Sequence, residues 1–231
     1  MATDEQPAPG SSPRSRWLPV HAVPITSWRA PSRWRARPIT LLILFVGLYL
    51  FGTGDAILVQ AGLGVSPWTV FAQGLGLRLG ISVGWATLVI SVIVLLAWLP
   101  LRERPGLGTI ANALVVSLAL GVGILVLPAV DGLGMQMLAV TAGVAIIGLG
   151  SGFYLTTGLG PGPRDGLMTG IHLRTNMAVV PVRWGIELTA LAIGWQLGGT
   201  VGPGTMVFAA LIGPSVGYGL LVVGRLGGHS L

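Results

Sequence analysis

Apolar stretches of about 20 residues dominate the chain, and this is the length that a helix needs to cross the roughly 30 Å hydrocarbon core of a bilayer. Only 9% of the 231 residues are charged, against about 25% in a soluble domain, and the mean hydropathy is +0.82. These features predict an all-α polytopic membrane protein, with the lipid bilayer as its first partner.

Six transmembrane helices are predicted. They cover residues 38–60, 81–101, 108–129, 134–156, 178–197 and 204–224. Residues 1–37 are rich in Pro, Ser and Arg and contain no apolar core. A segment of that composition cannot bury enough apolar surface to fold, so we predict a disordered cytoplasmic tail there. The predicted membrane domain covers residues 38–231.

The distribution of arginine predicts the orientation of the spans. Eleven of the 13 basic residues lie in the tail, in the second and fourth connections or at the C-terminal end. Arg78 is the only one in the other loops, and Arg183 lies inside a span. Because basic residues accumulate in cytoplasmic loops, both termini are predicted to be cytoplasmic. The pI near 11.3 therefore reflects topology, and no nucleic-acid partner is predicted.

The membrane domain contains an internal repeat. A shift of 96 residues aligns 44–127 with 140–223 without a gap and gives 22 identities in 84 positions, where roughly 8 are expected by chance. The copies, about 38–129 and 134–225, hold three spans each, so the second must enter the membrane from the opposite side. Two inverted repeats are typical of secondary transporters, although a duplication used only for structure gives the same pattern.

After its first span, each copy has the pattern GLGxxP followed by a short segment, 66–80 or 162–175, that is too short and too polar to span. A Pro at the start favours a helix N-terminus, so each copy is predicted to contain a short helix that is either amphipathic and interfacial or re-entrant. If the helices are re-entrant, their N-termini meet near the centre of the membrane and favour anions. Gly158 and Gly160 form the turn of the second copy.

Charged residues of the second copy are the predicted solute-binding groups. Arg183 and Glu187 lie four residues apart in the fifth span, so they share a helix face. They either pair as a structural clamp or serve a ligand or a proton. Arg164 and Asp165 lie near the start of the second short helix, where a carboxylate suits the helix dipole. Thr69 takes the position of Asp165 in the first copy, so the site is asymmetric.

Other polar and aromatic residues have simpler interpretations. Asp55, late in the first span, is predicted to lie at a hydrated helix end, and the alternative is a role in a cavity. Five Trp residues near span ends are predicted to be interfacial anchors. They are Trp34, Trp68, Trp85, Trp98 and Trp195.

The motifs "AGLGVSPWTVFAQGL", "RPGLGTIANALVV" and "GLGPGPRDGLMTGI" make the chain similar to bacterial integral membrane proteins of the YczE/YyaS/YitT type, over roughly 38–225. This resemblance implies a multi-pass fold in the bacterial cytoplasmic (inner) membrane. Family members often carry an Asp after the "PW" of the first copy, whereas this chain has Thr69. The resemblance places Asp165 and Glu187 at family-like positions.

The function predicted from these features is a secondary transporter or permease for a small solute that could be an anion. The predicted site residues are Arg183, Glu187, Asp165, Arg164, Gly158, Gly160 and Thr69. The alternative is a non-transporting accessory or scaffold membrane protein. With no Cys, three scattered His and no visible nucleophile–base pair, no enzyme activity, metal or cofactor is predicted. Association of the chain with copies of itself stays open.

Overall fold

The structure, a computed structural model, describes residues 23–228 and forms eight helices in that range. They are α1 (Pro38–Ala61), α2 (Pro67–Leu79), α3 (Val83–Leu101), α4 (Leu107–Val126), α5 (Leu133–Thr156), α6 (Pro163–Thr175), α7 (Val179–Gln196) and α8 (Pro203–Leu226). The two short helices, α2 and α6, occur where the sequence predicts them, and the other six helices match the predicted spans within three residues at each end.

Five helices of the described chain are long and apolar enough to cross a membrane. They are α1, α3, α4, α5 and α8. Helix α7 has 18 residues but is less apolar, because it carries Arg183 and Glu187. The chain is therefore a polytopic α-helical membrane protein, and the sixth predicted span depends on α7 alone.

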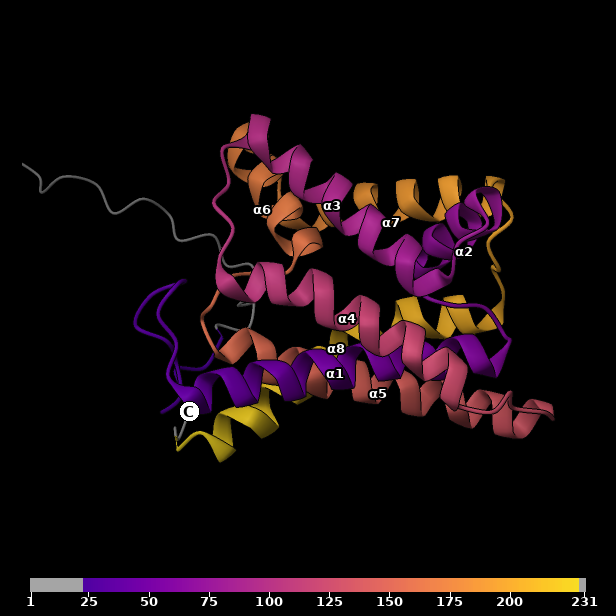
Figure 1. Cartoon of the computed structure of the whole chain (residues 1–231), viewed down its shortest axis with the longest axis horizontal. Coiled ribbons are helices and arrows are strands. Elements are labelled where there is room, and N and C mark those ends of the chain that lie inside the picture. The colour runs from indigo at the N-terminus through magenta and orange to yellow at the C-terminus, as the bar shows by residue number, and fades with distance from the viewer. Residues whose placement is uncertain (1–22, 229–231) are drawn as a thin grey trace, which may run out of the picture.

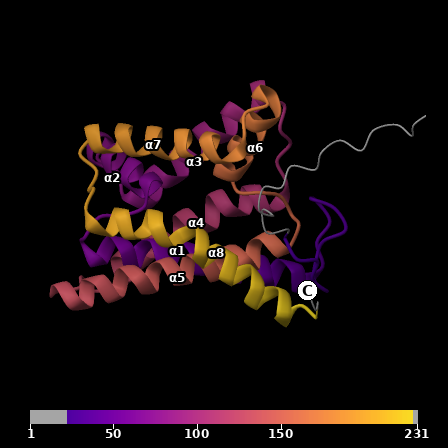
Figure 2. The ribbon, with the colours of Figure 1, turned by 180° about the vertical axis from the view of Figure 1, so that it is seen from behind.

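The helices lie in two layers (Figure 1). One layer contains α1, α4, α5 and α8, with α5 against α1 and α8, and α4 against α1. The other contains the two short helices with α3 and α7, where α2 packs on α7 and α6 packs on α3. The reverse view in Figure 2 shows the same division. Contacts between α3 and α4 join the layers.

Reciprocal glycine contacts hold α1 against α5. A Cβ added to Gly54 would lie 2.8 Å from the carbonyl oxygen of Gly143, and one added to Gly143 would lie 2.9 Å from that of Gly54. Gly47 and Gly150 face each other in the same way. The shift of 96 residues aligns Gly47 with Gly143 and Gly54 with Gly150. The two pairs of contacts therefore have matching positions in the two copies, and they bring the backbones close together.

Each glycine turn is bonded to the last long helix of the other copy. The Gly204 amide at the start of α8 donates to the Leu63 carbonyl at 2.8 Å, and the Gly108 amide at the start of α4 donates to the Leu159 carbonyl at 2.9 Å. The two bonds also correspond under the same shift. The turns thus tie the two copies together.

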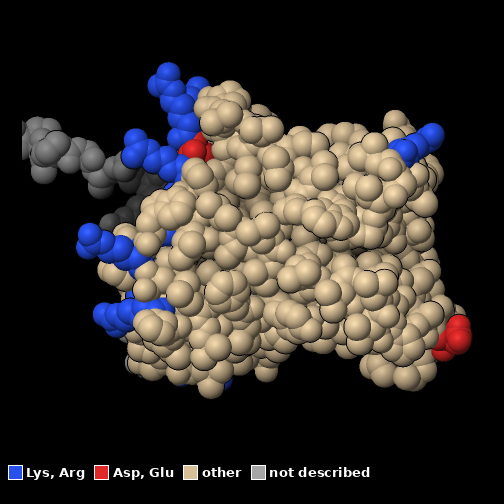
Figure 3. Space-filling view, viewed as in Figure 1, with Lys and Arg blue, Asp and Glu red and all other residues tan. Residues whose placement is uncertain are grey.

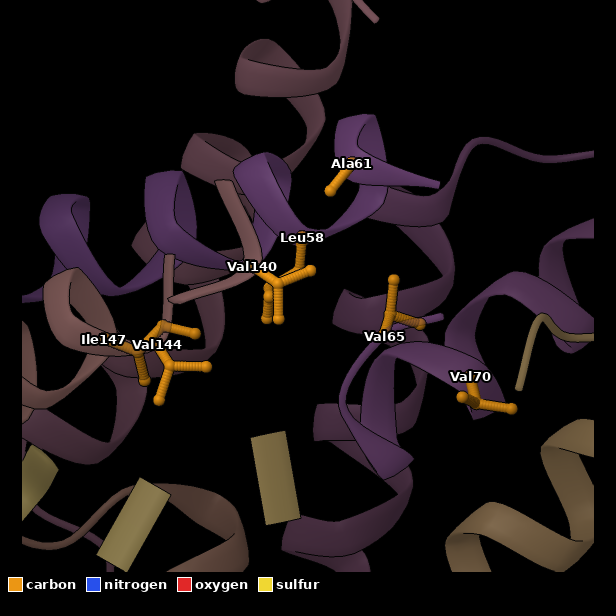
Figure 4. Close-up of a cluster of buried hydrophobic side chains, with 7 residues drawn as sticks. All are labelled: Leu58, Ala61, Val65, Val70, Val140, Val144 and Ile147. Carbon is orange, nitrogen blue, oxygen red and sulfur yellow. The ribbon is translucent and has the colours of Figure 1, made fainter. Parts of the chain in front are cut away.

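A buried apolar cluster surrounds the first of these turns (Figure 4). It contains Leu58, Ala61, Val65, Val70, Val140, Val144 and Ile147. These side chains come from α1, the turn, α2 and α5. The cluster fixes the direction in which the chain leaves α1 and enters α2.

Residues 23–37, predicted to belong to a disordered tail, are bonded to the helical body. The Ala30 amide donates to the Thr157 carbonyl at 2.8 Å, and the Arg33 carbonyl accepts from the Leu107 amide at 2.9 Å. These main-chain bonds join the segment to the turns before α6 and α4, which composition alone does not predict. The rest of the predicted tail, 1–22, lies outside the described residues.

Basic side chains gather at one end of the described molecule, the end where the C-terminus lies (Figure 3). The connections at this end carry most of the arginines. The opposite end contains the turns 62–66 and 127–132 and has little basic charge (Figure 3). The molecule is therefore electrostatically polar along the direction of its long helices.

Candidate functional site: a buried polar cluster between the short helices

The two short helices begin inside the protein and end at its surface. Helix α2 starts after Ser66, whose hydroxyl caps the Thr69 amide, and residues 66–70 are all buried. Helix α6 starts with a buried Pro163. Both last turns are exposed. The first turn of α2 is thus enclosed by protein, whereas in that of α6 Arg164 and Asp165 are half-buried.

Trp68 and Arg164 bring the two first turns together. The Arg164 guanidinium lies over the Trp68 ring, 5.0 Å from its centroid. Arg164 is half-buried, and a contact of this kind contributes about 1 kcal/mol. The 96-residue shift aligns Trp68 with Arg164, so equivalent positions of the two copies meet at this contact. From it α2 and α6 extend toward opposite ends of the molecule (Figure 1).

Asp55 lies inside this cluster, and the prediction of a hydrated helix end is wrong. Its side chain is 1% exposed and accepts a hydrogen bond of 3.3 Å from the Thr69 hydroxyl. The Thr69 hydroxyl also lies 2.8 Å from that of Ser66. Asp55 is seven residues after the buried Leu48 and three before Leu58. That helical spacing was the available signal for burial, which counting from the end of the span overlooked.

Asp165 is held by a partner that sequence reasoning missed. The Tyr154 hydroxyl donates to its carboxylate at 2.5 Å, and the Tyr154 side chain is only 4% exposed. This bond joins α5 to α6, just as the bond between Asp55 and Thr69 joins α1 to α2. In one copy the carboxylate belongs to the long helix, and in the other it belongs to the short helix.

Glu187 joins the cluster from α7, and Arg183, one turn earlier on the same helix, is exposed. Glu187 is half-buried, and its carboxylate interacts electrostatically with the guanidinium groups of Arg164 and Arg183. Arg164 also interacts with Asp55. Within the described residues no ion pair of 4.0 Å or less joins Arg183 to Glu187. Within the same residues no such ion pair joins Arg164 to a carboxylate either. Arg164 is the less exposed of the two cations, and it acts on both Asp55 and Glu187.

Two of the five predicted Trp anchors are internal. Trp68 is 6% exposed and Trp98 is 2% exposed, because both pack around the start of α6. The Trp98 indole donates to the Pro163 carbonyl at 3.0 Å. The Trp68 indole nitrogen is buried and, within the described part of the chain, has no hydrogen-bond partner. The predicted anchors Trp34, Trp85 and Trp195 are exposed.

Gly158 and Gly160 shape the second turn and lie outside the polar cluster. Their φ angles are +68° and +115°, a region that other residues adopt only with strain. A Cβ on Gly158 would contact Arg29, and one on Gly160 would lie 2.8 Å from the Thr109 hydroxyl. The turn therefore aims α6 at the cluster without supplying groups to it.

Of the predicted site residues, the structure brings together Thr69, Arg164, Asp165 and Glu187 and adds Asp55, Trp68 and Tyr154. We call this set the polar cluster. Its carboxylates come from α1, α6 and α7, and the Arg164 guanidinium attracts those of Asp55 and Glu187. A multi-pass helical membrane protein with such a cluster between two short helices is the class that fold and site define.

Comparison with known proteins gives the family. Residues 38–219 match the model of a family of unknown function (DUF6198), and the chain belongs to this family. It is 41% identical over 207 residues to an uncharacterized protein of Haemophilus influenzae, covering 90% of this chain and 95% of that protein.

Two proteins of Bacillus subtilis are also similar. The uncharacterized membrane protein YczE is 35% identical over 171 residues, 73% of this chain and 80% of that one. The uncharacterized protein YyaS is 26% identical over 172 residues, 73% of this chain and 86% of that one. The resemblance to YczE and YyaS is thus confirmed, and it supports a bacterial membrane location. No solved structure matches the chain.

Proposed function

We propose that the chain is a secondary transporter or permease for a small solute, built from two inverted three-helix repeats. The observation that carries the proposal is the convergence of ionisable groups from α1, α6 and α7 at the first turns of α2 and α6. Ionisable groups inside a membrane are expensive and typically mark a solute or proton pathway. Sites between repeats, at the starts of interrupted helices, are typical of transporters.

The reciprocal contacts support the inverted repeat. The glycine contacts between α1 and α5, and the bonds from each turn to α4 or α8, recur at positions 96 residues apart. The pairing of α2 with α7 has its counterpart in the pairing of α6 with α3. Helix α7 is then the sixth span, and its Glu187 faces the polar cluster instead of lipid. Rocking of one repeat against the other would expose the cluster to each side in turn.

Basic charge gathers at the end of the molecule that holds the C-terminus (Figure 3). This supports a location in the inner membrane of a bacterial cell, with both termini in the cytoplasm.

The charges of the polar cluster indicate which solute the site favours. The expectation of an anionic solute depends on Arg183 and on the N-termini of the two short helices. Arg183 is exposed, and carboxylates of Asp55, Asp165 and Glu187 lie near those N-termini. The site therefore favours a neutral or cationic solute. We propose no enzyme activity, because the polar cluster offers binding groups and an indole instead of a nucleophile with its base.

Solute flux into proteoliposomes tests the proposal. A panel of small cations, neutral solutes and anions should include a solute that wild type moves faster than empty vesicles do. Glu187→Gln should lower that flux at least tenfold. Asp131→Asn removes an exposed carboxylate that is not part of the polar cluster, so it should leave the flux unchanged. No flux above empty vesicles for the whole panel would favour the accessory or scaffold function instead.

A further inference from the structure

An apolar cavity of about 450 Å³ opens between the four helices of the second layer, α2, α3, α6 and α7. Its lining includes Trp68, Val94, Leu167 and Ile186. Thr189 supplies the only side-chain hydroxyl of the lining, and this hydroxyl already donates to the Gly185 carbonyl at 2.7 Å. The cavity thus suits the apolar body of an organic molecule, and it has the size of a small-molecule site.

Polar groups without a matching partner border this cavity on one side. The buried Trp68 indole lines it, and its nitrogen has no hydrogen-bond partner in the described chain. Glu187 follows the lining residue Ile186 on α7, and its carboxylate lies near the Trp68 indole without forming a hydrogen bond of regular geometry with it. An unpaired buried donor costs roughly 1–3 kcal/mol. A bound group that draws the Glu187 carboxylate inward would bring it within reach of this N–H.

The charges around the cavity decide what that group is. Asp55, Asp165 and Glu187 carry three carboxylates, against two guanidinium groups, those of Arg164 and Arg183. Of the two cations, Arg183 is exposed. Arg164 is already engaged with the Trp68 ring, and no charged residue lines the cavity. In a medium of low polarity an excess of carboxylates attracts a cation strongly and repels an anion.

We propose that this cavity binds a lipophilic organic cation, an inference that rests on the proposed transport function. Its apolar body fills the space between α3 and α7, and its positive centre lies beside the Glu187 carboxylate. That carboxylate then accepts the Trp68 indole hydrogen with its second oxygen. The substrate class of the transporter is accordingly amphipathic monovalent cations.

Binding of two probes to the purified full-length chain in detergent tests the charge requirement. Tetraphenylphosphonium and tetraphenylborate are close in size and shape and opposite in charge. Equilibrium dialysis should show saturable binding of tetraphenylphosphonium, at least tenfold tighter than that of tetraphenylborate. Glu187→Gln should remove this preference, whereas Asp131→Asn should keep it. Equal binding of both probes by wild type would overturn the inference.

A second variant tests the location without removing a charge. Gly185 lines the cavity, and a Cβ added there meets nothing within 4 Å. Gly185→Leu should therefore fill the cavity and lower tetraphenylphosphonium affinity at least tenfold, while thermal stability is retained because Leu favours the helix more than Gly does. Full affinity in this variant would place the binding site elsewhere.

Flux and binding together separate the inference from the transport proposal. If tetraphenylphosphonium binds with the expected charge preference but no solute of the panel is transported, the cation site stands and the transport proposal fails. If some solute is transported through a pathway that needs Glu187 but tetraphenylphosphonium does not bind, transport stands and the cation site is wrong.

Discussion

The two short segments of this protein, 62–79 and 158–175, have the same backbone and different side chains. Each begins with a turn of two glycines at positive φ, continues with a buried Pro at the start of the helix and ends at an exposed last turn. At the equivalent positions where they meet, one contributes Trp68 and the other Arg164. The shared positions therefore define how the copies pack, and the differing positions define what the interior of the molecule can bind.

The shared positions should carry the largest effects on stability. Gly54→Leu and its counterpart Gly150→Leu would each force a side chain against the backbone of the facing helix, because even a Cβ would lie within 2.8 Å of it. Each should destabilise the protein by about 3 kcal/mol or more. Thermal unfolding in detergent measures this.

Gly134→Leu is the matched control for these two variants, because Gly134 also lies in α5 but a Cβ there meets nothing within 4 Å. It should unfold at the wild-type temperature or above. If only one of the two interface variants were destabilised, the equivalence of the copies would be broken.

The next largest effect on stability is expected from variants that give the first copy the polar side chains of the second. Thr69→Asp would place a second carboxylate beside the buried Asp55 and should destabilise the protein by about 2 kcal/mol through like-charge repulsion. The double variant Asp55→Ser/Thr69→Asp copies the second repeat, where Ser151 and Asp165 stand at these positions.

The double variant should recover at least half of the stability that Thr69→Asp loses, as denaturant unfolding would show. A double variant less stable than Thr69→Asp would mean that the two copies do not share this environment.

The hydrogen bonds that join long and short helices come third. Tyr154→Phe removes the donor to Asp165, and Thr69→Val removes the donor to Asp55. A hydrogen bond to a charged group contributes about 1.5–3 kcal/mol, and the shorter bond of 2.5 Å should be the stronger. Tyr154→Phe is therefore expected to cost more than Thr69→Val in unfolding measurements. The reverse order would mean that burial of the carboxylate outweighs bond geometry.

Much of this fold could be predicted from the sequence, because glycine, proline and apolar length act locally. The starts of α2 and α6 follow from Pro67 and Pro163, and the long helices follow from the apolar stretches. The glycines align in the repeat, but the repeat does not predict their contacts between α1 and α5.

The partners inside the cluster could not be predicted in this way. The burial of Asp55 has a signal in its helical spacing from Leu48 and Leu58. The bonds of Asp55 to Thr69 and of Tyr154 to Asp165 depend on contacts between helices, which leave no periodic signal in one chain.

The tryptophans show the same limit of prediction from the sequence. Distance from a span end predicts an interfacial anchor for Trp34 and Trp85, which are indeed exposed. The same reasoning fails for Trp68 and Trp98, because their neighbourhood is set by α6, a helix from the other copy. An anchor and a core Trp therefore cannot be distinguished until the packing of the repeats is known.

The two internal tryptophans provide the smallest and sharpest comparison. Trp98→Phe removes an indole hydrogen bond to Pro163 of 3.0 Å and should cost about 1 kcal/mol beyond any loss of packing. Trp68→Phe removes an indole nitrogen that has no partner within the described residues. Phe keeps an aromatic face for the Arg164 guanidinium. The remaining loss of packing is offset by release of an unsatisfied donor, so the net effect should lie within about 0.5 kcal/mol. Unfolding of both variants, with and without tetraphenylphosphonium, measures their stabilities and the effect of the ligand on each.

Tetraphenylphosphonium should stabilise Trp98→Phe as much as wild type. It should stabilise Trp68→Phe less, because the bond that the ligand would induce between Trp68 and Glu187 is missing. Equal stabilisation of both would show that the unpaired indole has no part in binding.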